Sequence, residues 1–86
     1  MSGLAADIIG LIGTALFIAA FLYANVAEKL DKLWFNAANL IGAALLLTSL
    51  SVKFNLAAFV LEAAWAVIAA YGLIRALLER RKDRGA

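Results

Sequence analysis

Three apolar stretches of membrane-crossing length occupy most of this chain. Residues 8–27 and 33–52 contain no charged side chain, and residues 54–74 contain one, Glu62. A transmembrane helix needs about 20 mostly apolar residues, and each stretch supplies them. Hydrophobic residues make up 66% of the 86 residues, against about 45–50% in soluble domains. The sequence therefore predicts an all-α integral membrane protein with three transmembrane helices.

The predicted helices cover about residues 4–24, 33–51 and 55–78, and a basic tail follows at residues 79–86. Ser2 is the expected N-cap of the first helix, because its hydroxyl can accept a free backbone N–H. The connection between the first two helices is predicted to be helical, since Glu28 and Lys32 stand four residues apart. No repeat or linker divides the chain, so residues 1–86 form one predicted domain.

Cysteine and histidine are absent from the sequence, which removes thiol nucleophiles, disulfides and imidazole chemistry. No nucleophile–base pair is visible among the remaining residue types. We therefore expect neither an enzyme nor a protein with a metal or a cofactor.

Basic residues are distributed unequally between the two sides of the predicted spans. Lys29 and Lys32 follow the first span and five further basic residues follow the third, whereas Lys53 alone lies between the second and third. The positive-inside rule then predicts an outer N-terminus and a cytoplasmic C-terminus. The short tail has no aromatic or folded platform, so we interpret it as a topology anchor and expect no nucleic-acid partner.

Glu62 is the charge that a transmembrane helix would have to tolerate. A charged side chain near the bilayer centre costs on the order of 3 kcal/mol, and intramembrane acids usually have a function. The carboxyl group either binds a proton or a cationic solute, or it is a neutral hydrogen-bonding clamp between helices. Trp65, one turn further along, either packs or offers its ring to a bound amine.

Asn36 and Asn39 share one face of the second predicted helix. They are read either as interhelical hydrogen-bonding residues or as the lining of a path. Glu62 and Asn39 should differ by roughly 10 Å in height at about 1.5 Å per residue, so we expect no direct bond between them.

Small residues recur at spacings of three and four on the first and third predicted helices, and such stripes allow close helix contact in lipid. The small stripe of the first helix, in which Phe17 is the one large member, comprises Gly3, Ala6, Gly10, Gly13, Phe17, Ala20 and Ala24. The predicted packing residues are Gly10, Gly13, Gly42, Ala69 and Gly72. We expect self-association through the small stripe of the first helix, the polar stripe of the third, or both. Because three helices cannot enclose a solvated path, a parallel homodimer is predicted.

The stretch 39–75 resembles a family of small uncharacterised bacterial inner-membrane proteins that are described as permease-like. The resemblance is carried by Asn39, Gly42, Ser49, Leu50, Asn55, Phe59, Glu62, Trp65, Tyr71 and Gly72. More distantly, the chain resembles the SemiSWEET and PQ-loop half-transporters, which work as parallel homodimers. It has neither proline nor glutamine, so the Pro-Gln motif of that group is absent.

The preferred hypothesis is a homodimeric small-solute transporter or permease of the bacterial inner membrane. Glu62 would be its proton or cation site, and Asn36, Asn39 and Trp65 would line the path. The partners expected are the lipid bilayer, a second copy of the chain and a small polar or cationic solute. The alternative is a structural or accessory membrane protein whose polar residues lock the helix packing.

Overall fold

The computed structural model describes the backbone of residues 1–85 and the side chains of residues 1–82. The described residues form three helices, α1 (Gly3–Val26), α2 (Lys32–Leu50) and α3 (Leu56–Gly85). Each of these helices is long and apolar enough to cross a membrane. For the described part of the chain, the predicted all-α class and its three membrane-length helices are confirmed.

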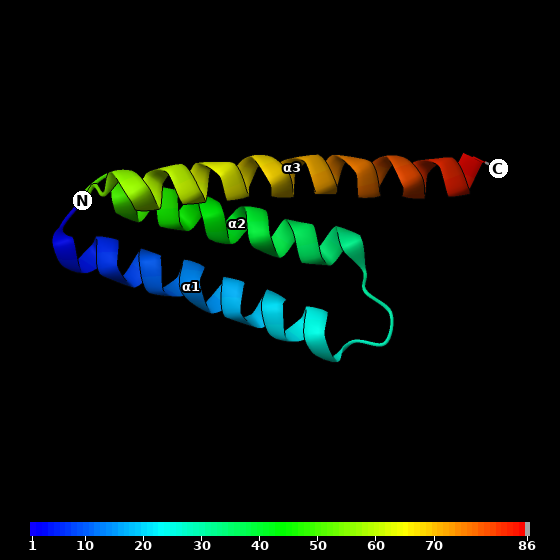
Figure 1. Cartoon of the computed structure of the whole chain (residues 1–86), viewed down its shortest axis with the longest axis horizontal. Helices are drawn as coiled ribbons and strands as arrows, with labels where there is room; N and C mark the ends of the chain where they lie inside the picture. The colour runs from blue at the N-terminus through cyan, green and yellow to red at the C-terminus, as the bar shows by residue number, and fades with distance from the viewer. Residues whose placement is uncertain (86) are drawn as a thin grey trace.

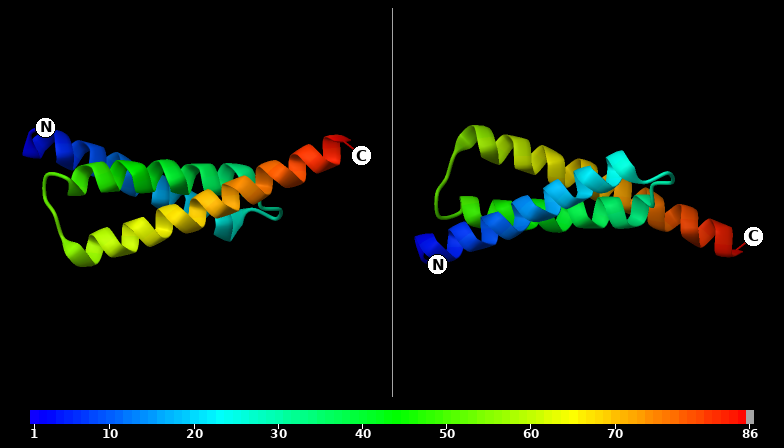
Figure 2. Two further views of the ribbon diagram at one scale, coloured as in Figure 1. Left: turned by 90° about the horizontal axis from the view of Figure 1, so that it is seen from above. Right: turned by 90° about the horizontal axis from the view of Figure 1, so that it is seen from below.

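Helix α2 lies between α1 and α3 and packs along both of them (Figure 1). The chain reverses direction twice, through residues 27–31 at one end and residues 51–55 at the other. Both outer helices cross α2 at an angle, and α3 extends past the end of α2 (Figure 2). The 30 residues of α3 account for the long dimension of 49 Å, at about 1.5 Å per residue.

Two glycines bring the backbones of α1 and α2 together. A Cβ atom on Gly13 would lie 2.8 Å from the carbonyl oxygen of Gly42, and one on Gly42 would lie 3.1 Å from the oxygen of Gly13. Nearby, a Cβ atom on Gly10 would lie 2.9 Å from the hydroxyl oxygen of Ser49. Only glycine permits this approach, which gives the van der Waals contact that holds helices together in lipid.

The small-residue stripe of α1 is therefore covered by α2 within one chain. Its members Ala6, Gly10, Gly13 and Ala20 are buried, whereas Ala24 at its end is exposed. The expectation that this stripe joins two copies of the chain does not fit this arrangement, because one surface cannot contact α2 and a second copy together. A second copy would have to use another face.

Small side chains fill the interior, and large ones face outward. Among the side chains of residues 1–82, the buried hydrophobic residues are all alanines, namely Ala6, Ala20, Ala43, Ala69 and Ala76. Large apolar side chains such as Leu11, Ile18 and Val67 are more than 60% exposed. This distribution suits a lipid environment, in which apolar surface gains nothing from burial and close backbone contact stabilises the bundle.

Side chains cap the helix ends, as the short connections require. The Ser2 hydroxyl accepts the N–H of Ala5 at 3.1 Å, which confirms the predicted N-cap. The side-chain oxygen of Asn55 accepts the N–H of Ala58 at 3.1 Å at the start of α3. Asp31 caps α2, and its Oδ1 accepts the N–H of Leu33 at 3.0 Å.

Two local predictions differ from the structure. Residues 27–31 are not helical, because α1 ends at Val26 and Asp31 must adopt an extended cap conformation before α2 begins. The basic tail, expected to lie beyond a helix ending near residue 78, continues α3 to Gly85. Glutamate, arginine and lysine are good helix formers, and no proline interrupts them.

Candidate functional site

Trp65 of α3 contacts both other helices near the middle of the bundle. Its indole Nε1 donates a hydrogen bond of 3.0 Å to Oδ1 of Asn39 on α2. Its ring lies 5.6 Å from the ring of Phe17 on α1, measured between centroids, at an interplanar angle of 46°. Such tilted aromatic pairs are favourable. Trp65 therefore joins α3 to α1 as well as to α2.

Phe17 reaches Trp65 because Gly42 has no side chain. A Cβ atom on Gly42 would lie 2.7 Å from Cδ1 of the Phe17 ring. The ring thus occupies the space that any other residue at position 42 would fill. Phe17 is the one large residue in the small stripe of α1, and the missing Cβ explains how a large side chain fits there.

Both polar ends of the Asn39 side chain have partners. Asn39 is 4% exposed, Nδ2 donates to the carbonyl oxygen of Phe35 at 2.8 Å, and Oδ1 accepts from Trp65. Trp65, rather than Glu62, is the α3 partner of Asn39, in keeping with the height difference expected from the sequence. The Asn39–Trp65 bond therefore joins α2 to α3 at this level.

Asn36 lies one turn from Asn39, against Gly72 of α3. Its Nδ2 donates to the carbonyl oxygen of Lys32 at 2.8 Å. A Cβ atom on Gly72 would lie 2.6 Å from Cγ of Asn36, so the absence of a side chain on Gly72 makes room for the amide. A cavity of about 190 Å³ adjoins this contact, and Asn36, Asn39, Trp65 and Ala69 are among its lining residues.

Glu62 lies on the other side of Trp65, in a depression between α1 and α3. The depression has a volume of about 150 Å³ and is lined by Phe17, Leu61, Glu62 and Trp65. Oε2 of Glu62 is buried and has no hydrogen-bond partner among the described residues. A buried carboxyl oxygen without a partner is unfavourable, so this atom is poised to accept a proton or a donor group.

Opposite charges are kept away from Glu62 in this structure. Among the side chains of residues 1–82, the ion pairs are Lys53–Asp7, Arg75–Glu79 and Arg80–Asp31. None of the three includes Glu62. Glu62 shares its depression with the rings of Phe17 and Trp65 instead, and aromatic faces attract cations. A carboxyl group beside these rings can hold a proton or a small cation.

The four residues predicted for the site lie together, although they do not form one cavity. Trp65 lines the depression that contains Glu62 and also the cavity beside Asn36 and Asn39. The indole is thus a wall between the two spaces. Among the described residues, no group of three or more aspartate or glutamate side chains could hold a metal ion.

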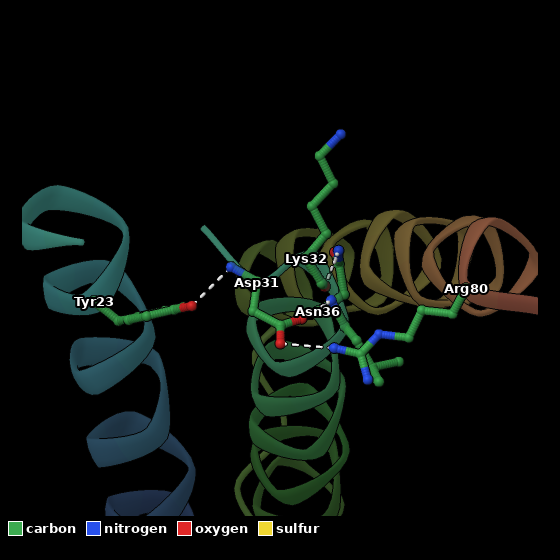
Figure 3. A network of polar contacts seen from close by, with 6 residues as sticks. Tyr23, Asp31, Lys32, Asn36 and Arg80 are labelled. Atoms are coloured by element: carbon green, nitrogen blue, oxygen red, sulfur yellow. Dashed lines mark hydrogen bonds and ion pairs between the residues drawn. The ribbon is translucent and has the colours of Figure 1, made fainter. Parts of the chain in front are cut away.

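A second polar cluster lies at the start of α2, around Asp31 (Figure 3). The backbone N–H of Asp31 donates to the Tyr23 hydroxyl at 2.7 Å, and Arg80 Nη2 donates to Oδ2 of Asp31 at 2.7 Å. Asp31 therefore connects α1, α2 and α3. The sequence signal was an aspartate immediately before an apolar helix, which predicts a cap but not the two tertiary partners.

Residues 6–81 match the model of a family of uncharacterised proteins. The chain belongs to this family. The match includes every residue discussed for the site, from Phe17 to Gly72, and it agrees with the sequence resemblance to a family of small uncharacterised membrane proteins.

No curated protein and no solved structure matches the chain. The distant resemblance to SemiSWEET and PQ-loop proteins is therefore not supported by any match.

Proposed function

We propose that this protein is a small-solute transporter or permease subunit in which Glu62 is the proton or cation site. The observation that carries the proposal is the buried Oε2 atom of Glu62, which has no partner among the described residues and faces a depression lined by Phe17 and Trp65. An acidic side chain in a membrane-spanning helix without a counter-charge is energetically unfavourable, and acids retained at such positions usually have a function. A small polar or cationic solute, such as an amine, fits a carboxylate beside aromatic rings.

A homodimer is part of the proposal. The depression beside Glu62 measures only about 150 Å³, and a bundle of this size fills its interior with side chains. A second, parallel copy facing the α1–α3 side would place two Glu62 residues along one path. Because α2 covers the small stripe of α1, this side supports such a contact better than that stripe does.

We place the protein in the bacterial inner membrane with its N-terminus outside. The support is the basic residues near the 27–31 connection and along the end of α3, which the positive-inside rule assigns to the cytoplasm. The sequence has no cysteine, so single cysteines can be introduced at Ser2 and at Gly85. In intact cells an impermeant maleimide should label the first and not the second; the reverse pattern would refute this orientation.

Glu62→Gln tests the proposed site directly. Glutamine keeps the size of the side chain and its hydrogen-bonding capacity but cannot ionise. The variant should fold and assemble as the wild type does, yet lose pH-dependent uptake or cation binding in proteoliposomes. Glu79→Gln, on the exposed inner end of the same helix, is the matched control and should keep the activity. Transport by Glu62→Gln equal to that of the wild type would exclude the proton or cation role.

The second candidate function is structural, and one observation favours it. The Trp65 indole N–H donates to the Asn39 side-chain oxygen across the α2–α3 interface, as expected of residues whose role is helix packing. In that case Glu62 is a protonated side chain that contributes only to helix packing, and Glu62→Gln leaves folding and assembly unchanged. A panel of small amines, none of which moves in proteoliposomes that hold folded protein, would favour this accessory function. An enzymatic function finds no support in the residues of the site.

A further inference from the structure

A charged cleft lies at the inner end of the bundle, away from Glu62. It has a volume of about 520 Å³ and lies between the 27–31 connection, the start of α2 and the inner part of α3. Lys29, Lys32 and Arg80 bring positive charge to it, and Leu30, Leu33 and Ala76 are among its apolar lining residues. Figure 3 shows Arg80 reaching the Asp31 carboxylate on the side opposite Tyr23, while the Lys32 side chain extends away from this pair.

The acidic residues of the cleft are already paired. Asp31 holds Arg80 at 2.7 Å, and Glu79 lies 4.0 Å from Arg75. Neither Lys29 nor Lys32 takes part in an ion pair within residues 1–82. Three basic and two acidic side chains line the cleft, and Arg75 outside it pairs with Glu79, so Lys29 and Lys32 are the lining charges without an opposite partner within residues 1–82.

The apolar part of the cleft continues toward the membrane-spanning surface. A neighbouring depression of about 380 Å³ is lined by Leu33, Leu77, Arg80 and Arg81, so it shares Leu33 and Arg80 with the cleft. Cationic groups thus stand at the edge of a leucine-lined surface. This combination fits an amphipathic ligand with an anionic head and an apolar body better than it fits a free anion.

Aromatic residues place the cleft at the level of lipid headgroups. Trp34 of α2 is 68% exposed and Tyr71 of α3 is 62% exposed, both on the inner half of the bundle. Exposed tryptophan and tyrosine side chains gather at the membrane–water interface. The lysines at the adjoining helix end are then within reach of lipid phosphates, and basic pockets at such helix ends suit anionic headgroups.

We propose that this cleft binds the headgroup phosphate of an anionic phospholipid, with Lys29 and Lys32 as the charge contacts and Leu33 and Leu77 against the acyl chains. A phospholipid headgroup and free inorganic phosphate both offer a phosphate group to these lysines. The leucine-lined extension assigns the site to the lipid. The proposal does not depend on transport or on Glu62.

The test measures thermal unfolding of the full-length protein in a zwitterionic detergent. Dihexanoyl phosphatidylglycerol, dihexanoyl phosphatidylcholine and inorganic phosphate are titrated separately. The midpoint temperature of unfolding should rise with phosphatidylglycerol but not with phosphatidylcholine or inorganic phosphate. In Lys29→Gln/Lys32→Gln the half-saturating concentration of phosphatidylglycerol should increase about 30-fold, because each basic group at a lipid surface contributes to binding.

Lys53→Gln/Lys82→Gln is the matched control, because it removes the same charge from positions that do not line the cleft. It should change the half-saturating concentration less than about twofold. An equal loss in the control, an equal rise with phosphatidylcholine, or an equal rise with inorganic phosphate would overturn the proposal. Lys29→Gln alone changes an exposed loop residue, so it provides a readout if the double variant does not fold, with an expected loss of about fivefold.

Discussion

Helix α2 contacts its two neighbours in different ways. Against α1, Gly13 and Gly42 set backbone against backbone, and a Cβ atom on Gly13 would lie 2.8 Å from a carbonyl oxygen. Against α3, Gly72 lies beneath the amide of Asn36, which is a side chain that can rotate. The first contact is made by backbone atoms, which can separate only if the two helices move apart. The second is formed by polar side chains that can rearrange.

The difference bears on where function can reside. The α2–α3 interface holds the Asn39–Trp65 bond, and Trp65 is also a wall of the Glu62 depression. A change in the indole position would alter both spaces at once. The α1–α2 contact offers only packing, so we expect α3 to be the helix that shifts during a functional cycle while α1 and α2 stay together.

Gly13→Ala should have the largest effect, because the added methyl group meets a backbone oxygen and forces the helices apart. We expect the free energy of unfolding to fall by about 2 kcal/mol, as in other overpacked interiors. Titration with sodium dodecyl sulfate in mixed micelles measures this change. Ala15→Leu, on the exposed side of the same helix, is the control and should stay within about 0.5 kcal/mol of wild type.

An unfolding free energy of Gly13→Ala equal to that of the wild type would show that the α1–α2 contact is looser than this structure has it. The comparison between a fixed and an adjustable interface would then fail. A shift of the variant from dimer to monomer without loss of stability would return the small stripe of α1 to its expected role in self-association.

Asn39→Leu should have an intermediate effect. It removes the acceptor of the Trp65 indole N–H, and hydrogen bonds between membrane helices contribute about 0.6 kcal/mol on average and about 1.7 kcal/mol at most. A double-mutant cycle with Trp65→Phe isolates the coupling of the pair. Additive losses in the double variant would mean that the two side chains contribute independently and that the bond does not join α2 to α3.

Gly72→Ala should have the smallest effect. The added methyl group displaces the Asn36 amide, and alanine gains up to about 1 kcal/mol over glycine as a helix former, so the two contributions nearly cancel. We expect the free energy of unfolding, measured by the same detergent titration, to lie within about 0.5 kcal/mol of the wild-type value. A loss as large as that of Gly13→Ala would show that the α2–α3 contact is as rigid as the α1–α2 contact.

Sequence periodicity located the elements of the site but not their partners. It placed Glu62 and Trp65 one turn apart on one face, and Asn36 and Asn39 together on another. It could not show that Trp65 bonds Asn39, because that bond depends on how deeply α3 lies against α2. Phe17 was noted only as the exception in a small stripe, and its contact with Trp65 depends on the missing Cβ of Gly42.

The sequence by itself determined that the chain forms membrane-length helices, because long uncharged apolar stretches have few other stable solutions. It also determined which faces are small or polar. Tertiary structure decided that α2 lies between its neighbours, that it covers the small stripe of α1, and that Glu62 faces the α1–α3 side. Those outcomes depend on contacts between residues far apart in the chain, which helical periodicity does not encode.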